Sequence, residues 1–170
     1  MIFKENDMEK YLALLRQSGA DLARVIDPKT VATAPWVAFK CQYGCPYYGK
    51  NLCCPPRTPA WRETQAMLDC FGTAILFRCH DITAASPLAL EAVRRLFRDG
   101  YYKATALGSG PCLLCEACDP AGCRHPGQAV PSMEACGIDV FATARANGMA
   151  VETLADETQQ QNCFGLVLVE

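Results

Sequence analysis

Apolar side chains recur every three or four residues in four stretches of the chain, which is the spacing of helices with one buried face. The predicted helices cover residues 7–18, 58–69, 86–100 and 131–146. Gly19 and Gly100 are expected to end the first and third helices, and Pro59 to lie in the first turn of the second. In the fourth, five side chains are expected to face inward: Met133, Cys136, Val140, Phe141 and Ala144.

Other apolar stretches lack helical spacing and predict strands. Residues 73–78 are expected to form a buried strand, and residues 150–154 and 164–169 an antiparallel hairpin with a long connection. Residues 31–39 are apolar but contain Pro35, so the prediction there is an edge strand at best. The mixture predicts an α+β fold, a sheet with packed helices, over residues 1–170 as one domain.

The overall composition is that of an ordinary globular protein, with 51% hydrophobic and 20% charged residues. A net charge of -2 argues against nucleic acid as the main partner, because phosphate binding needs clustered cations. Arg94, Arg95 and Arg98 form a basic cluster, which is interpreted as the solvated face of a helix. No apolar run approaches the roughly 18 residues of a membrane span, so we expect no membrane association.

The twelve cysteines are the departure from this ordinary composition. The first ten residues are charged and lack the apolar core of a signal peptide, which indicates a cytoplasmic protein whose thiols stay reduced. Eight of the cysteines lie in two segments. The first cysteine segment, residues 41–56, reads Cys-x3-Cys-x7-Cys-Cys-Pro-Pro, and the second, residues 108–126, contains Cys-x2-Cys-x2-Cys-x4-Cys.

The spacing of the second segment favours an iron-sulfur cluster. It matches the bacterial ferredoxin run Cys-x2-Cys-x2-Cys-x3-Cys-Pro, apart from one additional residue before Cys123 and two residues before Pro126. Zinc is the alternative, but a structural zinc site uses two separated Cys-x2-Cys pairs or Cys/His mixtures. The segment also begins with Gly108-Ser109-Gly110-Pro111. These residues have two interpretations: they form an ordinary turn, or their glycines let backbone N–H groups approach the cluster sulfurs closely.

The first segment provides fewer ligands than the second. Cys53 and Cys54 are adjacent, so their side chains diverge and we expect only Cys54 to bind with its neighbours. The candidate ligands are then seven thiols: Cys41, Cys45, Cys54, Cys112, Cys115, Cys118 and Cys123. Two cubanes would lack one ligand. Either a remote thiol supplies it, or one iron stays open to a substrate or to another protein's ligand.

The remaining cysteines and both histidines have ordinary structural interpretations as well. The remote thiols considered as the missing ligand are Cys79, Cys136 and Cys163. Together with Cys70 they lie on apolar helix faces or in strands, where free cysteine commonly packs as a small hydrophobic side chain. His125 lies close to Cys123, and His80 follows Cys79; we expect both to be surface residues or to contact a ligand indirectly.

At these motifs the chain resembles the predicted metal-binding family known as domain of unknown function 2284. The resemblance is carried by residues 41–56 and 108–126, and by Pro-Ser-Met-Glu-Ala-x-Gly-Ile-Asp-Val at residues 131–140. It covers nearly the whole chain and implies metal binding by the seven candidate thiols. The adjacent Cys53 departs from the single cysteine expected before Pro-Pro.

The hypothesis from sequence is an iron-sulfur protein with two 4Fe-4S clusters that passes single electrons to a partner redox enzyme. One alternative is an iron-sulfur enzyme that binds its substrate at an open iron beside Cys41, Cys45 and Cys54. The other is a zinc-binding structural or scaffold protein.

Overall fold

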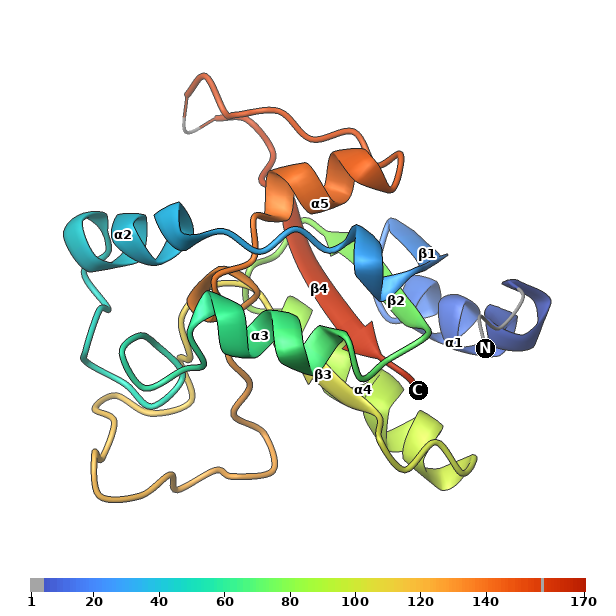
Figure 1. Ribbon diagram of the computed structural model, residues 1–170, viewed down its shortest axis with the longest axis horizontal. Coiled ribbons are helices and arrows are strands. Elements are labelled where there is room, and N and C mark those ends of the chain that lie inside the picture. Colours follow the sequence, from blue (N-terminus) through green and yellow to red (C-terminus); the bar gives the residue numbers. More distant parts are fainter. Residues whose placement is uncertain (1–4, 157) are drawn as a thin grey trace.

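A four-stranded antiparallel sheet with helices on both faces forms the frame of the protein (Figure 1). The computed structural model describes residues 5–156 and 158–170. The helices are α1 (Glu5–Gln17), α2 (Pro35–Gly44), α3 (Trp61–Leu68), α4 (Ala85–Arg98) and α5 (Val140–Ala146), with short 3-10 helices η1 (Pro28–Thr30) and η2 (Glu134–Cys136). The strands are β1 (Leu22–Ile26), β2 (Ala74–Cys79), β3 (Thr105–Leu107) and β4 (Cys163–Leu168).

The two central strands are the most apolar, because both of their faces are covered. The strand order is β1-β2-β4-β3, and β2 and β4 pair from Ala74↔Leu168 to Cys79↔Cys163. Successive side chains of a strand point to opposite faces. Ile75 and Phe77 accordingly enter one core, and Leu76 enters the other. The sequence predicted the buried strands at 73–78 and 164–169, and the structure confirms both.

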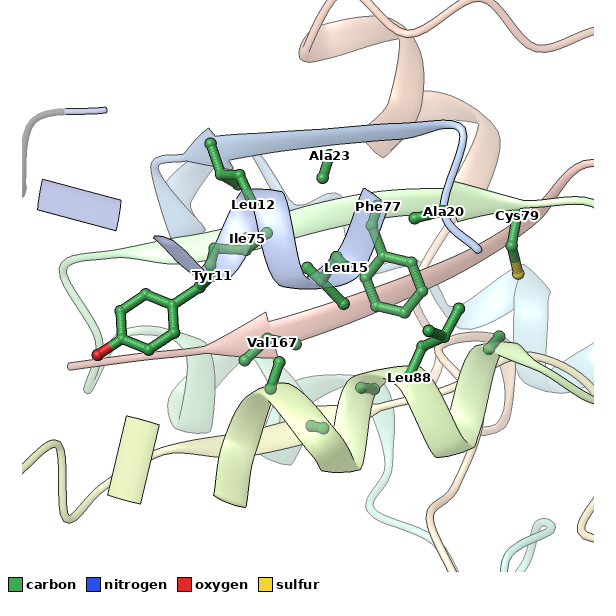
Figure 2. Close-up of a cluster of buried hydrophobic side chains, with 14 of the residues drawn as sticks. Tyr11, Leu12, Leu15, Ala20, Ala23, Ile75, Phe77, Cys79, Leu88 and Val167 are labelled. Atoms are coloured by element: carbon green, nitrogen blue, oxygen red, sulfur yellow. The ribbon is translucent and has the colours of Figure 1, made fainter. Parts of the chain in front are cut away.

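One face of the sheet is covered by α1 and α4 (Figure 2). The predicted inward face of α1, which includes Tyr11, Leu12 and Leu15, is fully buried there against β2. The Tyr11 hydroxyl donates a hydrogen bond of 2.8 Å to Asp99, just after the end of α4. Burial, followed by this bond, raises the pKa of Tyr11 to about 12. The bond therefore joins two elements that are far apart in the sequence.

The opposite face is covered by α3, η2 and α5, which belong to a second apolar core. The predicted helix over 131–146 is in fact two pieces, η2 and α5, separated at Gly137. This glycine has a φ of 76°, and a Cβ atom there would lie 2.7 Å from the Cβ of Trp61. Asp139 then caps α5 by accepting a 2.9 Å hydrogen bond from the Ala142 N–H. Phe141, predicted to be inward, is 37% exposed.

Two of the predicted strands are wrong. Residues 31–39 were expected to be an edge strand, but Pro35 is the first residue of α2. Proline suits this position, because the N–H group that it lacks would have no acceptor within the helix. The true edge strands are β1 and β3, which the sequence did not predict. Residues 150–154 form no strand either, and β4 pairs with β2 and β3 in place of the predicted hairpin.

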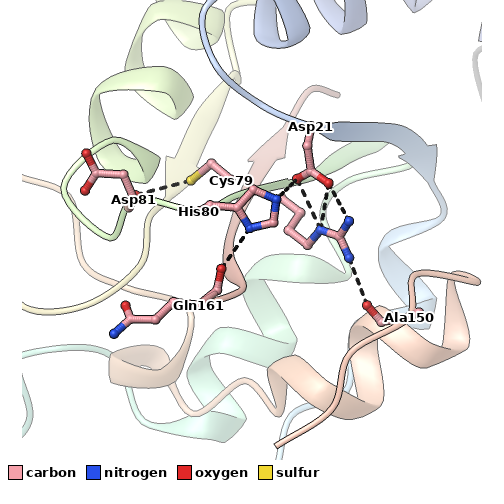
Figure 3. Close-up of polar contacts among 7 residues, drawn as sticks. Asp21, Cys79, His80, Asp81, Ala150 and Gln161 are labelled. Atoms are coloured by element: carbon pink, nitrogen blue, oxygen red, sulfur yellow. Dashed lines mark hydrogen bonds and ion pairs between the residues drawn. The ribbon is translucent and has the colours of Figure 1, made fainter. Parts of the chain in front are cut away.

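A polar cluster fastens the connection between α5 and β4 to the sheet (Figure 3). Arg78 of β2 donates from Nη1 to the Ala150 carbonyl at 3.1 Å and from Nε to the carboxylate of Asp21 at 3.1 Å. His80 bonds through Nδ1 to the Gln161 carbonyl at 2.9 Å. These bonds hold Ala150 and Gln161, at the two ends of this connection, near the end of β2.

Within the described chain, no helix is long and apolar enough to cross a membrane.

Candidate metal centre

The first cysteine segment begins in a helix. Cys41 lies in the last turn of α2, and Cys45 follows as its C-terminal cap, with its N–H donating to the Cys41 carbonyl at 3.2 Å. Residues four apart at a helix end lie on the same side. The chain then turns back on itself, and the Gly49 N–H donates to the Pro55 carbonyl at 2.8 Å. This turn brings the last thiols of the segment back toward α2.

Asn51 organises the two adjacent cysteines. Its buried side-chain oxygen accepts a 3.1 Å hydrogen bond from the Cys53 N–H. The Cys54 N–H donates to the Asn51 carbonyl at 3.3 Å. Burial raises the pKa of the Cys54 thiol. A hydrogen bond with the Asn51 side chain lowers this pKa, but burial has the larger effect and the pKa stays raised. Sequence spacing alone did not identify Asn51, and its position two residues before Cys53 was the available signal.

Three thiols come together in what we call the first thiol group: Cys41, Cys45 and Cys54. Burial raises the pKa of Cys41, and the charges of Cys45 and Glu134 raise it further. After burial, Cys45 and Cys41 likewise raise the pKa of Cys54. The neighbouring thiols therefore make the thiolates of Cys41 and Cys54 harder to form. A bound cation would relieve this mutual repulsion, which is the electrostatic signature of a metal-binding thiol set.

The second cysteine segment is a long loop with its two ends joined. The Gly108 N–H donates to the Pro131 carbonyl at 2.9 Å, and the Met133 N–H donates to the Gly108 carbonyl at 3.0 Å. Gly108 packs directly on α4, since a Cβ there would lie 2.1 Å from the Ser86 hydroxyl oxygen. The absence of a side chain at Gly108 therefore lets the loop base fit against α4.

Five thiols line one small recess in this region, and we call them the second thiol group: Cys53, Cys112, Cys115, Cys118 and Cys123. Burial raises the pKa of Cys53 to about 12, with further contributions from the charge of Cys112, a hydrogen bond between the two thiols, and the charge of Cys123. The His125 N–H points at the Cys123 sulfur at 3.4 Å. All four predicted thiols of the second segment thus lie together, joined by a fifth from the first segment.

A cavity of about 360 Å³ opens beside the first thiol group. All three thiols of the first thiol group line the cavity, together with Cys163 and apolar side chains that include Ile82 and Phe141. Glu134 of η2 is also part of the wall. Its Oε2 has less than 1 Å² exposed and no hydrogen-bond partner among the described residues. Sequence spacing did not single out Glu134, although this residue stands two residues before Cys136 in the motif of residues 131–140.

The remaining cysteines lie apart from the two segments. Cys79 and Cys136 are each 1% exposed in the apolar cores, as expected of small hydrophobic side chains. Cys163 is 4% exposed on β4, where its thiol is bonded to Ser109 and also faces the cavity. Cys70 was expected on an apolar face, but it is exposed and its thiol donates to the Ala66 carbonyl. His80 belongs to the polar cluster around Asp21 and lines neither the cavity beside the first thiol group nor the recess of the second.

The donor chemistry of both thiol groups fits a thiolate-bound metal. In the described parts of the chain, no three His, Cys, Asp or Glu side chains converge closely enough to hold a single metal ion. An iron-sulfur cluster does not require such convergence, since each thiolate binds a different iron. The enclosed, unpaired Glu134 oxygen is a second sign that this region is built to face a positive group.

The chain was compared with known protein families, curated proteins and solved structures. A family model described as "Predicted metal-binding protein (DUF2284)" matches residues 24–169. The matched part contains both cysteine segments and Glu134. No curated protein and no solved structure shows significant similarity to the chain.

Proposed function

Since the chain belongs to the DUF2284 family of predicted metal-binding proteins, we propose that it is an iron-sulfur protein that transfers single electrons to a partner redox enzyme. In this proposal the first thiol group and the second thiol group each hold one 4Fe-4S cluster. The ligands are Cys41, Cys45 and Cys54 at the first site and Cys112, Cys115, Cys118 and Cys123 at the second. Two such clusters, when bound, supply one-electron transfer.

The observation that carries this proposal is the contact between the two thiol groups. Cys54 belongs to the first, its neighbour Cys53 faces the second, and the charge of Cys112 acts on both of these thiols. The two thiol groups therefore meet at two consecutive residues of the chain. Adjacent centres suit this proposal, because electron transfer between two centres depends on their proximity.

The surrounding residues are suited to holding reduced, negatively charged centres. The Asn51 side chain bonds the Cys54 thiol, and the His125 N–H points at Cys123. Hydrogen bonds to ligand sulfurs stabilise added negative charge and thereby raise a reduction potential. Exposed apolar side chains on the second segment, Leu113 and Leu114, offer a surface for a redox partner. We propose a reducing, cytoplasmic location for this protein, because thiolate ligands persist there.

A second function is favoured by the cavity of about 360 Å³ beside the first thiol group. Ligand pockets are concave and mostly apolar, with a few polar groups. Ile82 and Phe141 supply apolar wall, and Ser109 and Glu134 supply polar groups. In this alternative the protein is an iron-sulfur enzyme whose substrate binds at the first site, where three thiols leave one coordination position for another donor.

Metal analysis of protein purified without oxygen tests the proposal. We expect a brown protein with about eight iron and about eight acid-labile sulfide per chain. Reduction should produce two interacting EPR signals, because two paramagnetic centres that lie this close couple magnetically. A colourless protein with stoichiometric zinc would contradict the iron-sulfur proposal and support the structural alternative. Two EPR signals without mutual broadening would count against electron transfer between adjacent centres.

A further inference from the structure

We propose that Glu134 supplies an oxygen ligand to the metal centre of the first thiol group. The inference rests on the proposed function and deepens it, because it assigns the position that three thiols leave without a protein ligand. It also changes the nature of that position: a carboxylate, and not an empty site, stands between the metal and the cavity.

Glu134 is held in place from both sides of η2. The Thr58 hydroxyl donates to the Ala135 carbonyl at 2.5 Å, and the Thr64 hydroxyl of α3 donates to the Cys136 carbonyl at 2.7 Å. The Ala34 N–H, immediately before α2, donates to the Gly137 carbonyl at 2.9 Å. The backbone that carries Glu134 is thereby fixed relative to α2, the helix that ends at the thiols of Cys41 and Cys45. Such fixed backbone is what orients a ligand.

The carboxylate has an unsatisfied oxygen. Oε2 of Glu134 is enclosed, with less than 1 Å² exposed, and finds no hydrogen-bond partner in the described part of the molecule. The carboxyl is otherwise hydrogen-bonded to its own backbone N–H and to the Ser132 side chain, so the missing partner is that of Oε2 alone. A buried oxygen without a partner is destabilising, and native structures place such groups where they have a role. An iron of the metal centre is the partner that this oxygen lacks, since carboxylate oxygen is a regular metal ligand.

Glu134 also lies next to the right thiols. It lines the same cavity as all three thiols of the first thiol group. Two other side chains on this wall are competing donors. The Cys163 thiol is engaged with Ser109, and the Glu152 side chain is 87% exposed and pairs with Arg145 at 3.6 Å. Glu134 is therefore the donor that combines enclosure with a free oxygen.

An oxygen ligand makes this coordination position exchangeable. Carboxylate is a harder and weaker ligand for an iron-sulfur centre than thiolate. A small donor molecule that enters the cavity can displace it: the metal–oxygen bond breaks, a bond to the incoming donor atom forms, and no electron is transferred. Cyanide is a suitable probe because it is small and binds iron strongly.

The test compares three variants of the full chain, purified without oxygen. E134Q keeps the size of the side chain but removes the charge, E134C replaces the carboxylate with a thiol, and E152Q is the matched control on the same wall. For each, we would measure iron and sulfide content, the rate of iron loss to a ferrous chelator, and the cyanide concentration that half-saturates the EPR change. Circular dichroism reports whether each variant is folded.

We expect E134Q to lose about four irons per chain to the chelator about ten-fold faster and to bind cyanide about ten-fold more tightly than the wild type. E134C should resist the chelator and need at least about ten-fold more cyanide, since a thiolate is harder to displace. E152Q should match the wild type. If folded E134Q and E134C both behave like E152Q, the assignment of Glu134 as a ligand is overturned while the proposed function stands. A wild type without iron and sulfide would overturn the proposed function and this inference with it.

Discussion

Cys53 and Cys54 are consecutive residues whose thiols face different thiol groups. The Cys53 thiol is hydrogen-bonded to that of Cys112, whereas the Cys54 thiol is acted on by the charges of Cys45 and Cys41. Both residues are buried, at 9% and 7% exposed. Asn51, which bonds the backbone of one and the thiol of the other, holds the turn that separates them. This one dipeptide is the boundary between the two candidate centres.

Replacing the two cysteines separately should therefore affect different centres. C54S removes a ligand of the first centre, so we expect iron to fall from about eight to about four per chain, with loss of one EPR signal. C53S should retain the signal of the first centre and shift that of the second. Iron analysis and EPR of the reduced protein measure both effects.

The control for these variants is C70S, because Cys70 is exposed, its thiol donates to the Ala66 carbonyl, and it belongs to neither thiol group. It should keep full iron and both signals. Loss of the first signal in C53S with its retention in C54S would contradict the assignment of the two thiols to different groups.

Metal removal should loosen the second cysteine segment without unfolding the sheet. Neither apolar core includes any of the four thiols of this segment, so α1, α4 and the central strands keep their packing. The loop itself is largely exposed and depends on its ligands for order. We expect trypsin to cleave after exposed Arg124 at least about ten-fold faster in the metal-free protein, while far-UV circular dichroism remains nearly constant. Cleavage at equal rates, or loss of the dichroism signal, would contradict this.

Gly165 should be sensitive to the smallest substitution. A Cβ atom there would lie 2.2 Å from Cζ of Phe77, its partner in the β2–β4 register, and Phe77 is fully buried. G165A should lower the free energy of unfolding by about 1–3 kcal/mol, because the ring has to move within a packed core. Denaturant unfolding measures this change.

Two further variants give the comparison for G165A. G127A adds a Cβ with nothing within 4 Å and should change stability by less than about 0.5 kcal/mol. In G165A/F77L the smaller side chain leaves room for the new methyl group, so the combined loss should be less than the sum of the single losses. Additive losses would show that the contact with Phe77 is not the cause.

The Asp21–Arg78 pair should contribute to stability at neutral pH. Burial raises the pKa of Asp21, but the hydrogen bonds and charge of Arg78, with His80, outweigh it and leave the pKa below its ordinary value. A lowered carboxyl pKa stabilises the fold above the unfolded pKa, and this contribution is lost as the pH falls through the folded pKa. At pH 7 a double-mutant cycle of D21N and R78Q should give a coupling free energy of about 1 kcal/mol. A coupling of zero would show that solvent screens the pair completely.

Local pattern was sufficient for the elements that bury one regular face. The spacing of Tyr11, Leu12 and Leu15 predicted α1, and the continuous apolar run at 73–78 predicted β2, because both depend only on the period of the backbone. The pattern failed where a short element depends on its neighbours. β1 and β3 are strands because β2 and β4 pair with them, and residues 35–44 are helical because Pro35 begins a helix there.

The candidate site divides in the same way. The sequence by itself determined which thiols are spaced to share a centre, since that spacing is a property of one continuous segment. Only the tertiary structure placed Cys53 with the second thiol group, brought Glu134 of η2 to the cavity beside Cys41, and made Asn51 the organiser of the turn. These relationships join residues whose distance in space is decided by how helices pack on the sheet, and no periodicity along the chain records that packing.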